Sequence, residues 1–320
     1  MSPWKMLPIS NAPYRRGRKP VKRRLTCRTG TSPRAVPPPG WPKRRFSRKA
    51  LGSVADAPGD RPVYAMSISA TPGNRQTADV TSDRLLGGRV RYMQPRTGFR
   101  AAIDPVLLAA AIPARPGERV LEGGTGAGAA LLCLATRIPG ITGLGIDRDH
   151  GLLRLARTNA VMNALPDLLF ACADLEVSPV GGPFDHAFAN PPYHAAGGTA
   201  SPSGSREAAK RSFPGLLPIW VAALSRPLRH RGTLTLILPT GLLGAALAAM
   251  HESKVPAEYV FPIWPKEGRP ARLMLVQGRK NGRSPLVLAA GLVLHTETGA
   301  FRPEAEIILR GGTSLLRAGT

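Results

Sequence analysis

Apolar and polar positions follow two alternating patterns from about Asp83 onward. Short apolar runs rich in Val, Ile and Leu, typical of buried strands, are separated by longer stretches with the apolar period of a helix. This alternation predicts an α/β domain with a mainly parallel sheet. The expected helices are 105–111, 129–137, 150–163, 216–224 and 242–250, and the expected strands are 119–121, 141–146, 168–171, 184–189, 233–238, 259–263 and 272–278. Two more β-like segments are expected within 291–310.

The first 80 residues lack this periodicity. They hold 17 Lys and Arg against three Asp, a net charge of +14, and 12 of the 33 prolines. Because such a segment cannot bury an apolar face, we expect residues 1–80 to be a disordered basic tail and residues 81–320 to form one domain. Three interpretations of the tail stay open: an extension upstream of a natural start near Met66, an electrostatic arm for RNA, or an organelle transit peptide.

The whole chain is strongly basic, with 44 Lys and Arg against 20 Asp and Glu and a formal net charge of +24. This excess indicates a polyanionic partner, most simply nucleic acid. Cys27, Cys133 and Cys172 form no Cys-x-x-Cys pair, so we expect neither a disulfide framework nor a metal site, and a reducing cytoplasm fits. The longest uncharged stretch, 232–250, is divided by Pro239 and Gly241, and no membrane span is expected.

A glycine-rich loop follows the first expected strand and precedes an apolar helix: Glu122-Gly123-Gly124-Thr125-Gly126-Ala127-Gly128. Glycines there allow a tight turn and the close approach of a ligand to the backbone. The dinucleotide fingerprint Gly-x-Gly-x-x-Gly needs a glycine where the chain has Leu131, which disfavours a nicotinamide or flavin. Glu122 would repel a pyrophosphate but attract an amino group, so the loop suits a zwitterionic cofactor. An ordinary tight turn is the alternative.

Two acids follow the next two expected strands. Asp147 comes 21 residues after Gly126, where a carboxylate can accept both hydroxyls of a ribose. Asp174 follows the third strand, where it can accept a hydrogen bond from an adenine amino group. Asp147 alone could equally be a solvated acid at a strand end. Together with Glu122, and in this order, the acids predict S-adenosylmethionine as the cofactor.

The expected strand 184–189 stops at Asn190-Pro191-Pro192-Tyr193. Two successive prolines fix a rigid corner that aims the Asn190 side chain and the neighbouring carbonyls at one point. The Asn190 oxygen and the Pro191 carbonyl can then accept both hydrogens of a planar amine, while Tyr193 stacks on a base. We predict that these four residues are catalytic. A proline-rich turn at a strand end is the alternative.

The loop 122–128, Asp147, Asp174 and the corner 190–193 resemble the motifs of class I S-adenosylmethionine-dependent methyltransferases. The tRNA1(Val) adenine N6-methyltransferase family is similar over roughly residues 81–315, in segments 83–90, 94–95, 98–100, 103–109, 292–295 and 308–311. The resemblance implies a Rossmann-like class I methyltransferase fold, with a seven-stranded mainly parallel sheet and helices on both faces. It also implies that Asp104 and Phe99-Arg100 cap the cofactor side of the cleft, which makes Asp104 a secondary cofactor residue. Gly123 is a departure from the family, which usually has a bulky apolar residue at this position, between the acid and the first glycine of the loop.

The leading interpretation is methylation of an adenine N6 in structured RNA, and the resemblance implies position 37 of a tRNA, just 3′ to the anticodon. The same corner serves DNA adenine N6-, ribosomal RNA guanine N2- and protein glutamine N5-methylation. The 56 residues after Trp264 are expected to finish the sheet, which leaves no room for a large DNA target-recognition domain. A net charge of +10 over residues 81–320 disfavours a protein substrate. A catalytically idle RNA-binding module is the non-enzymatic alternative. A cytoplasmic monomer without a membrane partner is expected.

Overall fold

The computed structural model describes residues 80–97, 101–192 and 213–315, all within the second of two compact units, Pro72–Thr320. The predicted tail, apart from Val80, lies outside the described residues. The strands are β1 (Val80–Leu85), β2 (Val90–Pro95), β3 (Arg119–Gly123), β4 (Thr142–Asp147), β5 (Leu168–Cys172), β6 (Phe184–Ala189), β7 (Leu228–Pro239), β8 (Ala257–Lys266), β9 (Leu273–Arg279), β10 (Val287–Leu288) and β11 (Leu292–His295). The helices are α1 (Asp104–Ala111), α2 (Ala129–Arg137), α3 (His150–Met162), α5 (Phe213–Ser225), α6 (Leu243–Glu252) and α7 (Pro303–Glu306).

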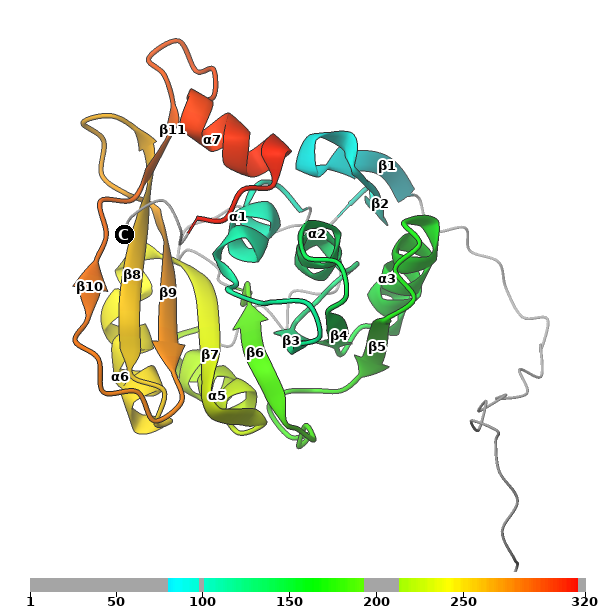
Figure 1. Cartoon of the computed structure of the whole chain (residues 1–320), viewed down its shortest axis with the longest axis vertical. Helices are drawn as coiled ribbons and strands as arrows, with labels where there is room; N and C mark the ends of the chain where they lie inside the picture. Colours follow the sequence, from blue (N-terminus) through cyan, green and yellow to red (C-terminus); the bar gives the residue numbers. More distant parts are fainter. Residues whose placement is uncertain (1–79, 98–100, 193–212, 316–320) are drawn as a thin grey trace, which may run out of the picture. The chain divides into compact units, whose positions relative to one another are not determined.

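One large sheet contains all seven strands predicted between residues 119 and 278. Its order is β10-β8-β9-β7-β6-β3-β4-β5, and β11 also pairs with β8 (Figure 1). The strands β5, β4, β3, β6 and β7 are parallel, and β9 lies antiparallel between β7 and β8. The predicted mainly parallel sheet is therefore confirmed. Two short strands, β10 and β11, extend it at β8.

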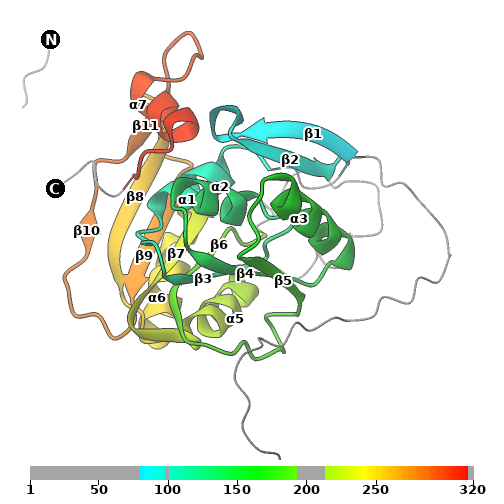
Figure 2. The same cartoon turned by 45° about the vertical axis from the view of Figure 1, so that its right-hand side comes forward.

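Helices cover both faces of this sheet, with α1, α2 and α3 on one side and α5 and α6 on the other (Figure 2). Successive residues of β3 point to opposite faces. Val120 packs in the core on the α1–α3 side, and Leu121 packs in the core against α5 and α6; both are fully buried. Because the central strands are covered on both faces, they read in the sequence as continuous apolar runs.

Two segments differ from the sequence prediction. β1 and β2 form an antiparallel hairpin that the apolar pattern does not mark, because four successive residues of β1, 81–84, are polar. Of the two β-like segments expected within 291–310, the first is β11, but the second is helical and the prediction was wrong. Pro303 begins α7, which continues into a helical turn at Ile307–Gly311. Proline suits the first turn of a helix, and Glu304 and Glu306 suit its positive end.

Two asparagines, one in α3 and one directly after it, hold the hairpin against the domain. Asn159 is fully buried; its Oδ1 accepts the Met93 N–H at 2.8 Å, and its Nδ2 donates to the carbonyls of Met93 (2.9 Å) and Ala127 (3.0 Å). One turn later, Asn163 makes the same pair of bonds to the Arg91 backbone, at 2.8 and 2.6 Å, in a more exposed position. Asn159 thus connects the hairpin, α3 and the glycine loop through one side chain.

Asn159→Leu should lower the free energy of unfolding by about 2–4 kcal/mol, because three backbone groups lose their partner in the interior. Asn163→Leu is the matched control and should cost about 1 kcal/mol or less, since water can replace its bonds. Urea denaturation of both variants gives the comparison. Equal losses would mean that burial of the Asn159 amide is not what holds the hairpin.

Candidate active site

The loops that carry the predicted site residues meet at one edge of the sheet. Because β3, β4, β5 and β6 are parallel, the glycine loop, Asp147, Asp174 and Asn190 each follow the carboxyl end of a strand. Gly123, at the end of β3, pairs with both β4 and β6, and Asp147 pairs with the last residue of β5. The structure therefore brings these predicted residues to neighbouring strand ends.

The glycine loop has backbone conformations that other residues avoid. Gly124, Gly126 and Gly128 have φ of 65°, 55° and 89°. A Cβ on Gly124 would lie 2.7 Å from the indole ring of Trp220, a half-buried residue of α5, whereas a Cβ on Gly126 would meet nothing within 4 Å. The backbone at Gly126 thus borders open space in which a ligand can lie directly against it.

Gly123 has no room for a side chain. A Cβ at this position would approach Leu175 to 2.7 Å and Leu224 to 2.9 Å, and both leucines are buried. The space beside Gly123 is filled by Leu175, from the turn after β5, and by Leu224, from α5. The start of the glycine loop is therefore closely packed, although Gly123 carries no side chain.

Glu122 lies inside the loop and is only 3% exposed. Its Oε2 accepts the hydroxyl of Thr125, which is also buried, at 2.6 Å, and its carboxylate accepts the Leu131 N–H in the first turn of α2. Burial, assisted by the charge of Asp147, raises the pKa of Glu122 to about 8, against the opposite effect of these hydrogen bonds. Glu122 and Thr125 fix the loop from within, and their contact with a cofactor stays a prediction.

Asp147 joins the loop after β3 to the loop after β4. Its Oδ2 accepts the Gly126 N–H at 2.8 Å, and its Oδ1 accepts the Asp149 N–H at 2.9 Å. The Thr125 N–H donates to the Ile146 carbonyl at 2.9 Å beside this contact. A carboxylate oxygen has two lone pairs, so this half-buried group retains acceptor capacity for the two hydroxyls of a ribose.

Asp174 and Asp104 are half-buried at the starts of a turn and of α1. The Asp174 Oδ1 accepts the Glu176 N–H at 2.9 Å, and its carbonyl accepts the Ser178 N–H at 2.7 Å, which fixes the turn after β5. Phe99 and Arg100, expected beside Asp104, lie outside the described residues. The roles of Asp174 and Asp104 toward a cofactor remain predictions.

The proline corner begins where β6 ends. Asn190 is half-buried, Pro191 is buried and Pro192 is exposed, while Tyr193 lies outside the described residues. Since the last residue of β6 pairs with Gly123, Asn190 follows alongside the start of the glycine loop. Its amide makes no hydrogen bond to any other residue that the structure describes. A role of Asn190 toward a substrate group stays a prediction.

Two positioning residues were missed from the sequence. Trp220 packs on Gly124 from α5, and Asn159 holds Ala127 from α3. No spacing rule connects either residue to the loop. The one available signal was a polar residue, Asn159, on the helix face that also carries Leu153, Ala156 and Ala160, all of which are buried.

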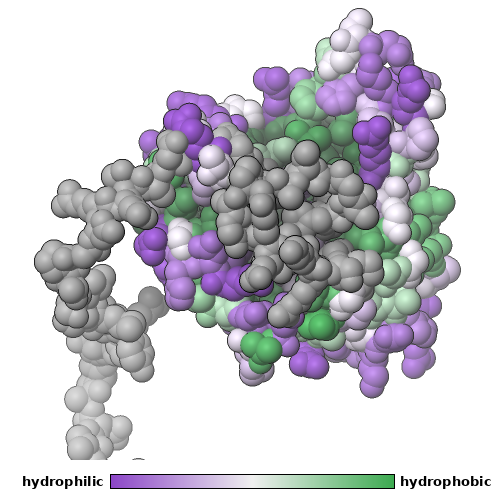
Figure 3. Space-filling view, turned by 180° about the vertical axis from the view of Figure 1, so that it is seen from behind, coloured by the Kyte–Doolittle hydropathy of each residue, from purple (hydrophilic) through white to green (hydrophobic). Residues whose placement is uncertain are grey.

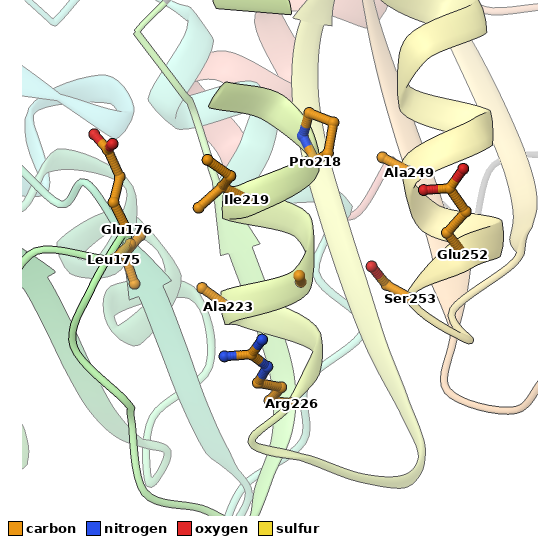
Figure 4. A pocket seen from close by; sticks show the side chains of 10 residues that line it. Leu175, Glu176, Pro218, Ile219, Ala223, Arg226, Ala249, Glu252 and Ser253 are labelled. Atoms are coloured by element: carbon orange, nitrogen blue, oxygen red, sulfur yellow. The ribbon is translucent and has the colours of Figure 1, made fainter. Parts of the chain in front are cut away.

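A groove of about 420 Å³ lies over α5, between the turn after β5 and α6 (Figure 4). Ile219 and Ala223 of α5 line it, with Glu176 on one side and Glu252 of α6 on the other. It contains none of the predicted site residues, so the candidate site follows from the strand ends and not from this hollow.

Residues 102–206, which include the glycine loop, the acids and the corner, match the family model described as Methyltransferase small domain. The match covers 105 of the 320 residues, and this region, which carries the candidate site, is similar to a methyltransferase small domain. A crystal structure of a predicted O-methyltransferase from Agrobacterium tumefaciens is similar, with a TM-score of 0.56 and 24% identity over 66% of this chain and 97% of that one. This similarity confirms the class I methyltransferase fold.

Two kinds of relative differ in how much of their length is matched. A release factor glutamine methyltransferase of Rhodospirillum rubrum is 35% identical over 143 residues, 41% of this chain and 42% of that protein. A tRNA1(Val) (adenine(37)-N6)-methyltransferase of Aeromonas hydrophila is 26% identical over 209 residues, 64% of this chain and 86% of that protein. The chain spans less than half the length of the release factor methyltransferases it matches.

The cofactor of this domain is S-adenosylmethionine, as the sequence predicts. The residues at the carboxyl edge fit it: the backbone at Gly126 borders open space, and Asp147 presents acceptors beside it. In the part of the chain that the structure describes, no helix combines the length and the apolar character needed to cross a membrane.

Glu122→Gln should flatten the dependence of stability on pH. The folded-state pKa of about 8 lies above the ordinary value of 4.5, so the stabilising contribution of Glu122 is fully present below pH 4.5 and is lost as the pH rises through about 8. Relative to the variant, the natural protein should lose more than about 1 kcal/mol of unfolding free energy between about pH 5 and about pH 8.5. Urea denaturation at both pH values measures this; parallel profiles would contradict it.

Asp147→Asn should weaken S-adenosylmethionine binding by about 1–3 kcal/mol, because an NH₂ donor replaces one of the two acceptor oxygens and the negative charge of the carboxylate is lost. Asp149→Asn is the matched control. Asp149 caps α3 by accepting the N–H groups of Gly151 and Leu152, a role that asparagine also performs, so cofactor affinity should not change. Titration calorimetry gives both affinities. If Asp147→Asn binds the cofactor normally, the ribose site lies elsewhere.

Proposed function

We propose that this protein transfers the methyl group of S-adenosylmethionine to N6 of an adenine in structured RNA, with position 37 of a tRNA as the expected target. The observation that carries the proposal is the Asn190 amide, which directly follows β6 next to the glycine loop and makes no hydrogen bond to any residue that the structure describes. The lengths of the matches support an RNA substrate over a protein substrate. The match covers 86% of the length of the tRNA methyltransferase but 42% of the length of the release factor methyltransferase.

The corner acts on the target amine by geometry. A planar exocyclic amine is a weak nucleophile because its lone pair is delocalised into the ring. The Asn190 oxygen accepts one amine hydrogen and the Pro191 carbonyl accepts the other, which draws the nitrogen toward a tetrahedral arrangement with its lone pair directed outward. Because proline fixes φ and has no N–H to donate, the corner holds this arrangement without reorganisation.

Bound S-adenosylmethionine supplies a methyl group on a sulfonium, which is a strong electrophile. The protein therefore needs no strongly basic side chain, and the proton released by the methylated nitrogen can pass to water. The residues around the site contribute position: Asp147 and the Gly126 backbone hold the ribose side of the cofactor, and Asn190 and Pro191 hold the amine.

Glutamine N5-methylation of a release factor is the second candidate, favoured by the 35% identity to the Rhodospirillum rubrum protein. A glutamine side chain also presents a planar NH₂ group, so the corner alone accepts either substrate. Incubation with methyl-labelled S-adenosylmethionine and, separately, tRNA, ribosomal RNA, DNA and a glutamine-bearing release factor decides between them. Label at N6 of a tRNA adenine supports the proposal, and label in the release factor alone rejects it.

Asn190→Ala should abolish detectable methyl transfer and leave S-adenosylmethionine affinity within a few-fold, because Asn190 contacts the amine and not the cofactor. Asn163→Ala, which removes an equally polar side chain far from this edge, should retain turnover. Single-turnover kinetics and calorimetry on the same preparations separate the two effects. Near-native turnover by Asn190→Ala would remove the corner from the mechanism.

A further inference from the structure

Three loops meet at the sheet edge opposite the cofactor, at the lower ends of β7, β8 and β9 in Figure 1. They are residues 226–232 at the start of β7, 253–256 before β8 and 280–283 after β9. Backbone bonds lock them together: the Asn281 N–H donates to the Lys254 carbonyl at 2.7 Å, the Arg231 N–H to the Lys280 carbonyl at 3.1 Å, and the Lys280 N–H to the Gly232 carbonyl at 2.8 Å. The three loops form one rigid surface.

This surface carries an excess of cations, and hydrophilic residues prevail at the lower right in Figure 3, where this part of the sheet lies. We call it the basic edge and define it by Arg226, Arg231, Lys254, Lys280 and Arg283; all but the half-buried Lys280 are exposed. Among the described residues, none of the five has a carboxylate partner.

Three of the four acids near the basic edge are paired with other groups. Glu118 binds His186 at 2.9 Å and Arg229 at 3.4 Å, and Asp185 also pairs with Arg229. Glu258 pairs with Arg279 at 3.0 Å. Glu252, at the end of α6, forms no ion pair with any residue that the structure describes. The fold therefore neutralises Arg229 and Arg279 but leaves the five cations of the basic edge uncompensated.

The backbone of the basic edge is unusual. Arg231, Lys254 and Asn281 have φ of 61°, 59° and 55°, a left-handed conformation that residues other than glycine seldom adopt. Such conformations persist where the surroundings enforce them, and they gather at sites with a function. Two of these left-handed residues, Arg231 and Lys254, are exposed cations, and they lie on loops that are hydrogen-bonded to each other.

The cations also repel one another. The Lys280 Nζ donates to the Ser225 carbonyl at 2.9 Å, and its pKa is lowered first by burial and then by the charge of Lys254. Crowded like charges are unfavourable in the free protein, and a bound anion would relieve the repulsion. The arrangement therefore favours a ligand with several negative charges.

We infer that the basic edge binds the phosphate backbone of the RNA substrate at a distance from the reacting base; the inference rests on the proposed function. The regular part of β7, Thr233–Pro239, runs from one edge of the sheet to the other and spans about 20 Å at about 3.3 Å per residue, so the two sites lie on opposite edges at least that far apart. A polymer with a phosphate at every nucleotide reaches both sites in one molecule. An acidic peptide of mixed composition matches five uncompensated cations less well.

The test is a double variant, Arg231→Asn with Lys254→Asn, in the full chain. Asparagine removes each charge and tolerates the left-handed backbone, so folding should be preserved. Arg84→Gln with Arg154→Gln removes two exposed charges from the hairpin and α3 and serves as the matched control. The probe is an unmodified tRNA transcript, titrated over a range of salt concentrations.

For the test variant we expect about a tenfold higher KM and Kd for the tRNA, with kcat and S-adenosylmethionine affinity unchanged. The slope of log K against log salt should become shallower by about 1.5, at roughly 0.7–0.9 for each lost phosphate contact. The control should match the natural protein.

Other outcomes are equally decisive. Normal RNA methylation with unchanged KM and salt slope in the test variant would overturn the inference and leave the proposed function standing. Binding of anionic phospholipid vesicles that the variant loses, with RNA kinetics unchanged, would assign the basic edge to a lipid surface and overturn it too. Failure of the natural protein to methylate any RNA would reject the proposed function itself.

Discussion

The hydrogen bond from the Gly126 N–H to the Asp147 carboxylate is the contact on which the geometry of the site depends. Parallel strands deliver their loops to the same sheet edge, but they do not fix the distance between the loops. Asp147 fixes it by accepting one N–H from each of two loops. A ligand that bridges these loops meets acceptors already in place, so little ordering entropy remains to be lost on binding.

The glycine loop is held from both faces of the sheet. On the α3 side, the buried Asn159 amide binds the Ala127 carbonyl. On the α5 side, Trp220 packs where a side chain on Gly124 would stand. Between them, Glu122 is bonded to Thr125 and to the start of α2. Each glycine is therefore required by a specific neighbour or by the open space at Gly126, and the loop has little freedom to collapse in the absence of a ligand.

The sequence predicted the central part of the fold well, for a physical reason. Strands buried on both faces and helices with one apolar face leave strong periodic signals, and the acids and the corner are placed by the ends of those strands. The hairpin lacked such a signal because it is held by Asn159, which lies 66 residues from Met93 in the chain. Likewise, the apolar residues Ile307 to Leu309 resemble a strand until Pro303 and its acids are considered. Burial of Glu122 depends on α2 and could not be read from local sequence.

Reaction chemistry and substrate choice depend on different parts of the domain. In the proposed mechanism the corner requires only a planar NH₂ group, so adenine and glutamine satisfy it equally, and identity between relatives over this region cannot distinguish them. Selection must then come from surfaces that contact the rest of the substrate. The basic edge lies the length of β7 away from the corner, and contacts there are unavailable to any ligand that does not extend along the domain. A substrate engaged at both edges is held in one register, because a shift that brought a different base to Asn190 would also break its phosphate contacts.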